Sequence, residues 1–118
     1  MNKYKQITTT LLKTLGAPAS LLGYQYIKDA VEMVMEDRSL LRGAVTKRLY
    51  PGIAKMNGTT STRVERAIRH AIGSCWDRGD QKLQLKMFGY SVDPNRGTPT
   101  NTEFIAALVE YIDMSKFF

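Results

Sequence analysis

Three arginines and a histidine stand close together in the middle of the chain, within the segment RVERAIRH at residues 63–70. The acidic residue among them is Glu65. The planar guanidinium of arginine can donate to both N7 and O6 of guanine, and a carboxylate can accept from the cytosine amino group. These residue types in this order predict readout of a G·C-containing duplex, with Arg63, Glu65 and Arg66 as the candidates for base contact.

This segment is predicted to lie on an amphipathic helix. Apolar residues recur at three- and four-residue steps, which is the period of one helix face. That apolar stripe consists of Val64, Ala67, Ile68, Ala71, Ile72 and Cys75. A second face carries Arg63, Arg66 and His70, with Glu65 and Arg69 beside it. The helix can therefore pack on a core while it presents cations to a partner.

The residues before this helix fit a helix-turn-helix motif. Ala54 is small enough to let two helices approach, Gly58 permits a turn with positive φ, and Val64 is the branched apolar residue that holds the second helix. The motif usually has a larger aliphatic residue three positions after Val64, and Ala67 departs from it. The spacing predicts a DNA-binding motif whose second helix enters the major groove.

The run Thr59–Thr62 supplies the candidates for the N-cap of the second helix. We expect Thr60 to be the cap, because that choice places Arg63 in the first turn. Thr62 and Glu65 also have the spacing of a capping box. The free amides and the positive dipole of such an N-terminus suit a phosphate, which makes Thr60, Ser61 and Thr62 candidates for contact with the DNA backbone.

Each of these assignments has a structural alternative. An arginine-rich helix can be a solvated surface. Glu65 can read a base, complete a capping box, or form an ion pair with Arg69 four residues later. His70 can donate to a phosphate or pack against the helix. The position of the arginines directly after the turn favours DNA contact.

The composition narrows the classes of function. The chain has 118 residues and a net charge of +6, which fits a polyanionic partner, either nucleic acid or an anionic membrane surface. No apolar run approaches the roughly 20 residues of a membrane span, and the N-terminus does not read as a secretory signal. With one cysteine and one histidine, neither an internal disulfide nor an ordinary zinc site can form. We expect no enzyme activity, no cofactor, and a buried Cys75.

The remaining pattern predicts an all-α fold of about six helices. Helices are expected around 7–15, over 22–36, over about 41–50, from Pro51 to the turn, after the turn, shortly after Gly79, and from Asn101 to about Met114. Thr100 and Glu103 form a predicted capping box at the start of the last helix. Residues 89–99 are rich in glycine and proline and are predicted to form a loop.

Several segments of the chain carry a family resemblance: GYQYIKDAVEMV, LYPGIAK, TSTRVERAIRHAI, W-x-R-G at 76–79, FGY at 88–90 and PTNTEFIA. In these segments the chain resembles the C-terminal DNA-binding effector domain of the master sporulation response regulator of endospore-forming bacteria, the stage 0 sporulation transcription factor family. The resemblance spans nearly the whole chain.

The resemblance implies a six-helix domain that binds a short box with a TGTCGAA-like sequence. It implies base contacts from Arg63, Glu65 and Arg66 and backbone contacts from Arg69 and His70. It also implies that segment 79–92 touches an RNA polymerase sigma factor. Members of that family act in the bacterial cytoplasm at the nucleoid, so the same location is expected here.

The chain also departs from the family's pattern. Full-length members begin with a phosphoacceptor receiver domain, whereas residues 1–118 are expected to form a single effector domain with no receiver domain. Segment 80–87 is more basic than in the family, and the tail from Asp113 is more apolar. The expected sigma-contacting and dimer surfaces therefore differ from those of the family.

The last helix and the tail carry more apolar residues than one inward stripe can bury. These are Leu108, Tyr111, Ile112, Met114, Phe117 and Phe118. The extra residues either close the core or form a weak self-contact when two copies occupy tandem DNA boxes.

The sequence therefore predicts a transcription factor domain that binds double-stranded DNA, has no membrane partner, and activates or represses sporulation-type promoters. The alternative is a receiver-less homologue that acts as a protein-interaction module or as an antagonist of a full-length regulator.

Overall fold

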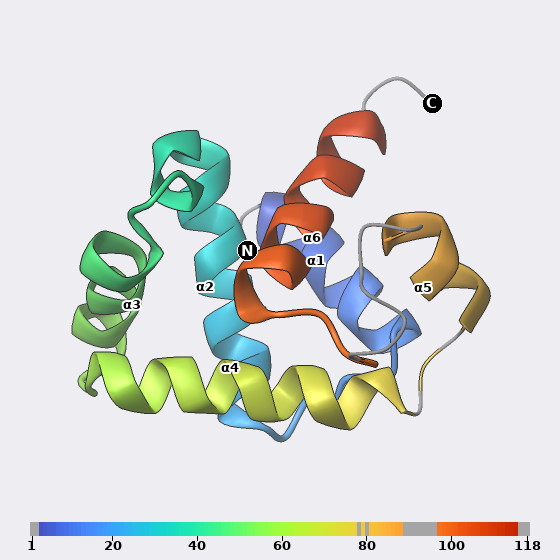
Figure 1. The fold of residues 1–118 in the computed structure, drawn as a ribbon, viewed down its shortest axis with the longest axis horizontal. Helices are drawn as coiled ribbons and strands as arrows, with labels where there is room; N and C mark the ends of the chain where they lie inside the picture. The colour runs from blue at the N-terminus through green and yellow to red at the C-terminus, as the bar shows by residue number, and fades with distance from the viewer. Residues whose placement is uncertain (1–2, 78, 80, 89–96, 116–118) are drawn as a thin grey trace.

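Helices form most of the described residues in the computed structural model, which describes residues 3–77, 79, 81–88 and 97–115 (Figure 1). The elements are α1 (Lys3–Thr14), α2 (Leu22–Glu36), η1 (Arg38–Leu41), η2 (Val45–Leu49), α3 (Tyr50–Asn57), α4 (Ser61–Trp76), α5 (Gln81–Phe88) and α6 (Asn101–Ser115). The predicted all-α class is confirmed, and α2 has the bounds that the sequence pattern predicts.

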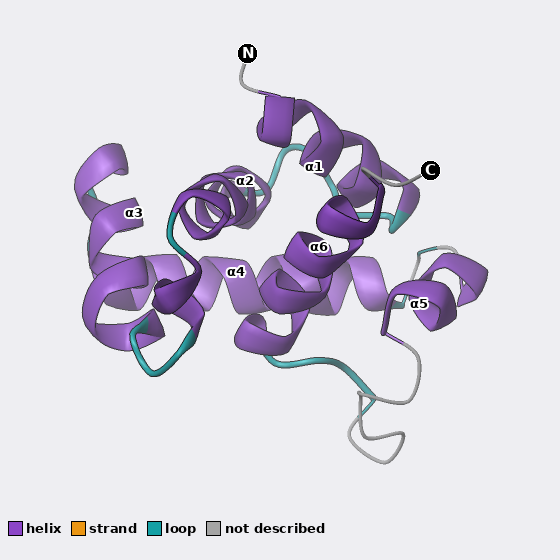
Figure 2. Cartoon of the chain, turned by 90° about the horizontal axis from the view of Figure 1, so that it is seen from above, coloured by secondary structure: helices purple, strands orange, loops and turns teal. Residues whose placement is uncertain are grey.

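Helix α4 forms one side of the molecule, and α2 and α6 lie across it (Figures 1 and 2). Helix α3 lies at the N-terminal end of α4, and α5 lies near its C-terminal end (Figure 2). The backbones of α2 and α4 approach closely at Gly23. A Cβ atom there would lie 2.0 Å from the carbonyl oxygen of Ala67 and 2.7 Å from the Cβ of Ala71. Only glycine at position 23 allows this approach.

The core holds the apolar stripes that the sequence predicts. In α6, the five residues expected to face inward are all buried: Phe104, Ile105, Leu108, Val109 and Ile112. Helix α5 is attached to this core by its last residue, Phe88. The ring of Phe88 lies 5.1 Å from Trp76, edge to face, and 5.6 Å from Phe104. The aromatic contacts therefore join α4, α5 and α6.

The surplus apolar residues of α6 divide between core and surface. Leu108 and Ile112 are buried, Tyr111 is half-buried, and Met114 is exposed. Phe117 and Phe118 lie outside the described residues. Core packing thus accounts for part of the surplus.

The expected regular helix over about residues 41–50 is wrong. The structure has a short 3-10 helix, η1, and a π-helical turn, η2, and the latter runs directly into α3. Gly43 lies between them with φ +76°, a left-handed conformation that interrupts an α-helix. The Asp37 carboxylate caps η1 through the backbone N–H of Ser39 at 3.0 Å, and Arg48 binds the same carboxylate at 3.1 Å.

The C-terminal end of α6 is also fixed. The guanidinium of Arg38 makes two hydrogen bonds to the carboxylate of Asp113, at 2.5 and 2.8 Å.

Within the described part of the chain, no helix is both long and apolar enough to cross a membrane.

Candidate nucleic-acid interface

The turn between α3 and α4 has the geometry that the sequence predicts. Gly58 follows α3 with φ +63° and ψ +39°, and its backbone N–H donates to the carbonyl oxygen of Ala54. The N–H of Thr59 donates to the same oxygen at 3.0 Å. A Cβ atom at Gly58 would meet no atom within 4 Å, so the backbone conformation, and not lack of space, requires glycine here.

Helix α4 begins with the predicted cap. The side chain of Thr60 accepts a hydrogen bond from the N–H of Arg63 at 3.3 Å, and the carbonyl oxygen of Thr60 accepts from the N–H of Val64 at 3.0 Å. The first turn of α4 is therefore fixed directly after the glycine turn. The alternative capping box of Thr62 and Glu65 does not supply this cap.

The two faces of α4 are separated as predicted. Val64, Ile68, Ala71, Ile72 and Cys75 are buried, and Ala67 is half-buried. The opposite face holds the exposed residues Thr62, Arg63, Arg66, Arg69 and His70. Ser61 is half-buried at the start of the helix. The structure thus brings the predicted cations together on one solvent-facing surface of the helix that follows the turn.

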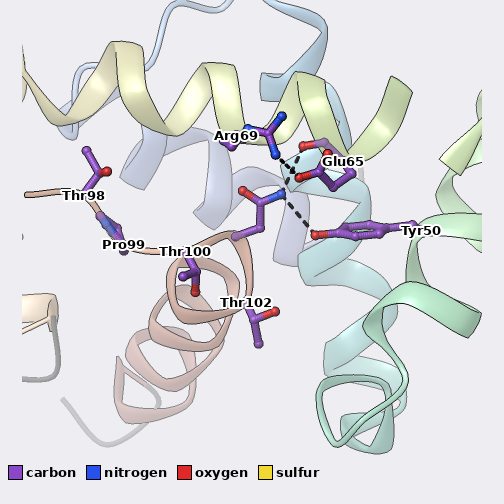
Figure 3. A pocket seen from close by; sticks show the side chains of 8 residues that line it. Tyr50, Glu65, Arg69, Thr98, Pro99, Thr100 and Thr102 are labelled. Atoms are coloured by element: carbon purple, nitrogen blue, oxygen red, sulfur yellow. Dashed lines mark hydrogen bonds and ion pairs between the residues drawn. The ribbon is translucent and has the colours of Figure 1, made fainter. Parts of the chain in front are cut away.

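Glu65 lies at the edge of this surface and forms an ion pair with Arg69, one turn further along α4 (Figure 3). The side chain of Arg69 is 63% exposed and that of Glu65 is 32% exposed. An exposed i, i+4 ion pair contributes only about 0.3–0.5 kcal/mol to the stability of the fold. A charged partner can therefore take the place of either side chain in the pair. The ion-pair alternative for Glu65 is therefore present in the DNA-free domain.

Two residues that sequence reasoning did not select lie beside Glu65. The side-chain amide of Asn101, the first residue of α6, donates to the hydroxyl of Tyr50 at 3.1 Å and to the backbone carbonyl of Glu65 at 3.1 Å. Tyr50 begins α3, and burial is the main cause of the raised pKa of its hydroxyl. These contacts span 51 and 36 positions, and no local pattern in the sequence reports them.

The same residues line a pocket of about 390 Å³ between α4 and the start of α6. Tyr50, Glu65 and Arg69 lie on one side, and residues 98–102 lie on the other (Figure 3).

The predicted capping box closes the first turn of α6. The N–H of Thr100 donates to the Glu103 carboxylate at 2.8 Å, and the N–H of Glu103 donates to the Thr100 hydroxyl at 3.1 Å.

Cys75 is buried, as predicted, and among the described residues no group of three His, Cys, Asp or Glu side chains could hold a metal ion. What the geometry offers is a capped helix with exposed guanidinium groups.

A comparison with known protein families matches residues 8–112 to the family described as sporulation initiation factor Spo0A C terminal. The match includes both helices of the turn motif and all the predicted contact residues. The chain therefore belongs to the Spo0A C-terminal family, the DNA-binding domains of sporulation transcription regulators.

Proposed function

We propose that this domain regulates sporulation promoters by reading a TGTCGAA-like box through the major groove, with α4 as the recognition helix. One observation carries the proposal. The exposed face of α4 concentrates the arginines directly after the Gly58 turn, where a helix-turn-helix places base-reading residues. The family membership supplies the DNA partner, and the residues supply the chemistry of readout.

Arg63 and Arg66 are the main base readers in this proposal. Both are exposed, and they lie one turn apart near the start of α4, where a recognition helix contacts base edges. Each guanidinium would donate to N7 and O6 of a guanine. Glu65 would accept from a cytosine amino group after it leaves Arg69, and that arginine would then be free for a phosphate.

Contacts with the sugar-phosphate backbone would surround these base contacts. Arg69 and His70 are exposed further along α4. At the start of the helix, the capped segment Thr60–Thr62 offers backbone N–H groups and hydroxyls to a phosphate. Such contacts hold the helix in register but carry no sequence information.

Contact with an RNA polymerase sigma factor is proposed for segment 79–92. Its described part includes α5, on which Leu85 is 62% exposed and Lys82 and Lys86 are exposed. Residues 89–92 lie outside the described residues. A weak contact between copies on tandem boxes is proposed for α6, where Met114 is 51% exposed.

The second candidate function is that of a protein-interaction module that antagonises a full-length regulator. The exposed apolar side chains of Leu85 and Met114 favour it. The arginine face of α4 argues against it, since a module without DNA does not need groove-reading residues after the turn.

A binding titration tests the two candidates. The chain is titrated against labelled duplexes that carry either the TGTCGAA-like box or a scrambled version of it. We expect tighter binding to the box, by a factor of at least about 1,000 when nonspecific binding is measured at the same salt concentration. A matched control removes one exposed lysine at the start of α1, Lys3→Ala, and should leave this ratio unchanged. Equal affinity for both duplexes would contradict sequence-specific readout and favour the interaction module.

A further inference from the structure

We propose that Asn101 is a positioning residue that sets the orientation of α4 for base readout, an inference that rests on the proposed function. Its side-chain amide bridges two elements that are distant in the sequence. One hydrogen bond goes to the hydroxyl of Tyr50 in α3 and the other goes to the backbone of Glu65 in α4, each at 3.1 Å. Asn101 is 9% exposed, so it acts from behind the DNA-facing surface.

The chemistry of the bridge requires an amide at position 101. A primary amide carries two N–H donors, and both partners present an oxygen to it. The isosteric aspartate would direct carboxylate oxygens at the carbonyl of Glu65, which has no proton to donate. Alanine would leave the hydroxyl of Tyr50, a residue that is 7% exposed, without this donor. A buried polar group that loses its partner is destabilising.

The bridge ends on α4 beside the two proposed base readers, Arg63 and Arg66. Glu65 lies between Arg63 and Arg66 in the sequence, so a rotation of the backbone at position 65 moves both guanidinium groups across the groove together. The side chain of Glu65 is held separately by Arg69. Asn101 thus holds the backbone of the residue whose side chain forms the exposed ion pair with Arg69.

Helix α6 is a rigid support for this bridge because it is held at both ends. At its start, the reciprocal hydrogen bonds of Thr100 and Glu103 fix the turn that carries Asn101. Near its end, Arg38 makes a bidentate contact with Asp113. The position of the amide is therefore set by the whole helix and not by a free loop.

The test compares sequence preference with stability. Asn101→Ala and Asn101→Asp are measured for affinity to the TGTCGAA-like box and to scrambled DNA, for the salt dependence of binding, and for thermal unfolding. We expect the ratio of the two affinities to fall about five- to tenfold, because both hydrogen bonds that hold the backbone of α4 to α6 and α3 are lost. The salt slope should not change, since it counts phosphate contacts. An unchanged ratio in both variants would overturn the proposal.

A matched variant separates positioning from stability. Ile105 is fully buried in the same helix. Ile105→Val removes one methyl group there and lowers stability, but it leaves the hydrogen bonds of Asn101 in place. It should keep the parent's affinity ratio. If Ile105→Val lowered the ratio as much as Asn101→Ala does, the effect would come from stability and the positioning role would be wrong.

Tyr50→Phe tests the bridge itself. It removes one acceptor but leaves the bond to the carbonyl of Glu65, so its effect on the ratio should be smaller than that of Asn101→Ala. The double variant should resemble Asn101→Ala alone, because the two residues act through one contact. Additive effects would contradict a shared contact. If the parent chain itself prefers neither duplex, the proposed function fails, whereas a preference that survives Asn101→Ala defeats only the positioning role.

Discussion

The carboxylate of Asp29 accepts a hydrogen bond from the side-chain amide of Asn57 at 2.9 Å, across 28 positions of the sequence. Asn57 is the last residue of α3, directly before the turn, and its amide also donates to the carbonyl of Ile53 at 2.8 Å. Asp29 is only 2% exposed and also binds Gln25 at 3.2 Å and Lys5 at 3.1 Å. One buried carboxylate therefore joins α1 and α2 to the helix that ends at the Gly58 turn.

We predict that Asp29→Ala destabilises the domain by about 1–3 kcal/mol, because the variant leaves the partners of a buried acceptor without it. Asn57→Ala removes the two hydrogen bonds of this amide, to Asp29 and to Ile53, and should cost about 1–2 kcal/mol. Urea unfolding of both variants measures the loss. Glu36→Ala, at an exposed position of the same α2, is the control. A loss for Asp29→Ala no larger than that of the control would show that the carboxylate does not hold the turn.

We predict that Gly58→Val lowers stability and DNA affinity together. A β-branched residue is poorly suited to φ +63°, and the cost of a left-handed conformation is about 1–2 kcal/mol or more. Gly58→Asn should be milder because asparagine tolerates this region. Since a Cβ atom at this position would meet nothing within 4 Å, a steric clash of that atom does not contribute to the loss in either variant.

Thermal unfolding and DNA titration are measured on both variants. A Gly58→Val domain that unfolds at the temperature of the parent would mean that the turn does not need a left-handed residue.

The cap and the turn of the helix-turn-helix could be predicted from the sequence, because each depends on residues that are close together in the chain. The cap at Thr60 follows from residue type and spacing, and the φ of Gly58 follows from the turn that the motif requires. The arrangement around η1 and η2 could not be predicted. Apolar periodicity does not report that Gly43 breaks the helix, nor that Arg48 reaches back to Asp37. The left-handed conformation of Gly43 and the contact between Arg48 and Asp37 override the period there.

The candidate site divides in the same way. The exposed arginines of α4 could be selected because they follow the turn and oppose an apolar stripe. Asn101, which contacts the backbone of α4 behind these arginines, could not be selected from the sequence. The hydrogen bonds of Asn101 depend on how α6 packs against α3 and α4, and the capping box at Thr100 locates only the start of α6.

We predict that Arg63→Ala and Arg66→Ala each remove about 1–3 kcal/mol of discrimination at one G·C position of the box. The reason is the bidentate contact that an exposed guanidinium can make with a single guanine. Affinities for a set of boxes with single base-pair substitutions measure the loss at each position. If either variant weakened binding to the box and to scrambled DNA by the same factor, that arginine would contact phosphate instead.

We predict a different result for Arg69 and His70. Arg69→Ala and His70→Ala should weaken binding to all duplexes similarly, because phosphate contacts carry no sequence information. Removal of Arg69 should also lower the slope of log affinity against log salt by about one unit. Titrations at several salt concentrations measure this slope. An unchanged slope together with an altered base preference for Arg69→Ala would assign this residue to base readout.

The last prediction concerns Cys75, which is 1% exposed on the buried face of α4. Burial raises the pKa of its thiol from 9.0 to about 11. In the unfolded chain the thiol ionises first, so the unfolded state binds fewer protons between these two pH values. Stability must therefore fall as the pH rises through this window, and this group alone contributes a loss of about 1.4 kcal/mol at pH 10.

Comparison with Cys75→Ala isolates this contribution, because tyrosines and lysines titrate in the same range in both proteins. The variant should be less stable than the parent at pH 7, since it loses buried volume. At pH 10 its disadvantage should shrink by about 1.4 kcal/mol, because alanine has no proton to release. Urea unfolding at the two pH values measures both differences. If the stability difference between variant and parent is the same at pH 7 and pH 10, the thiol ionises as readily in the folded domain as in the unfolded chain. Burial on α4 would then not raise its pKa.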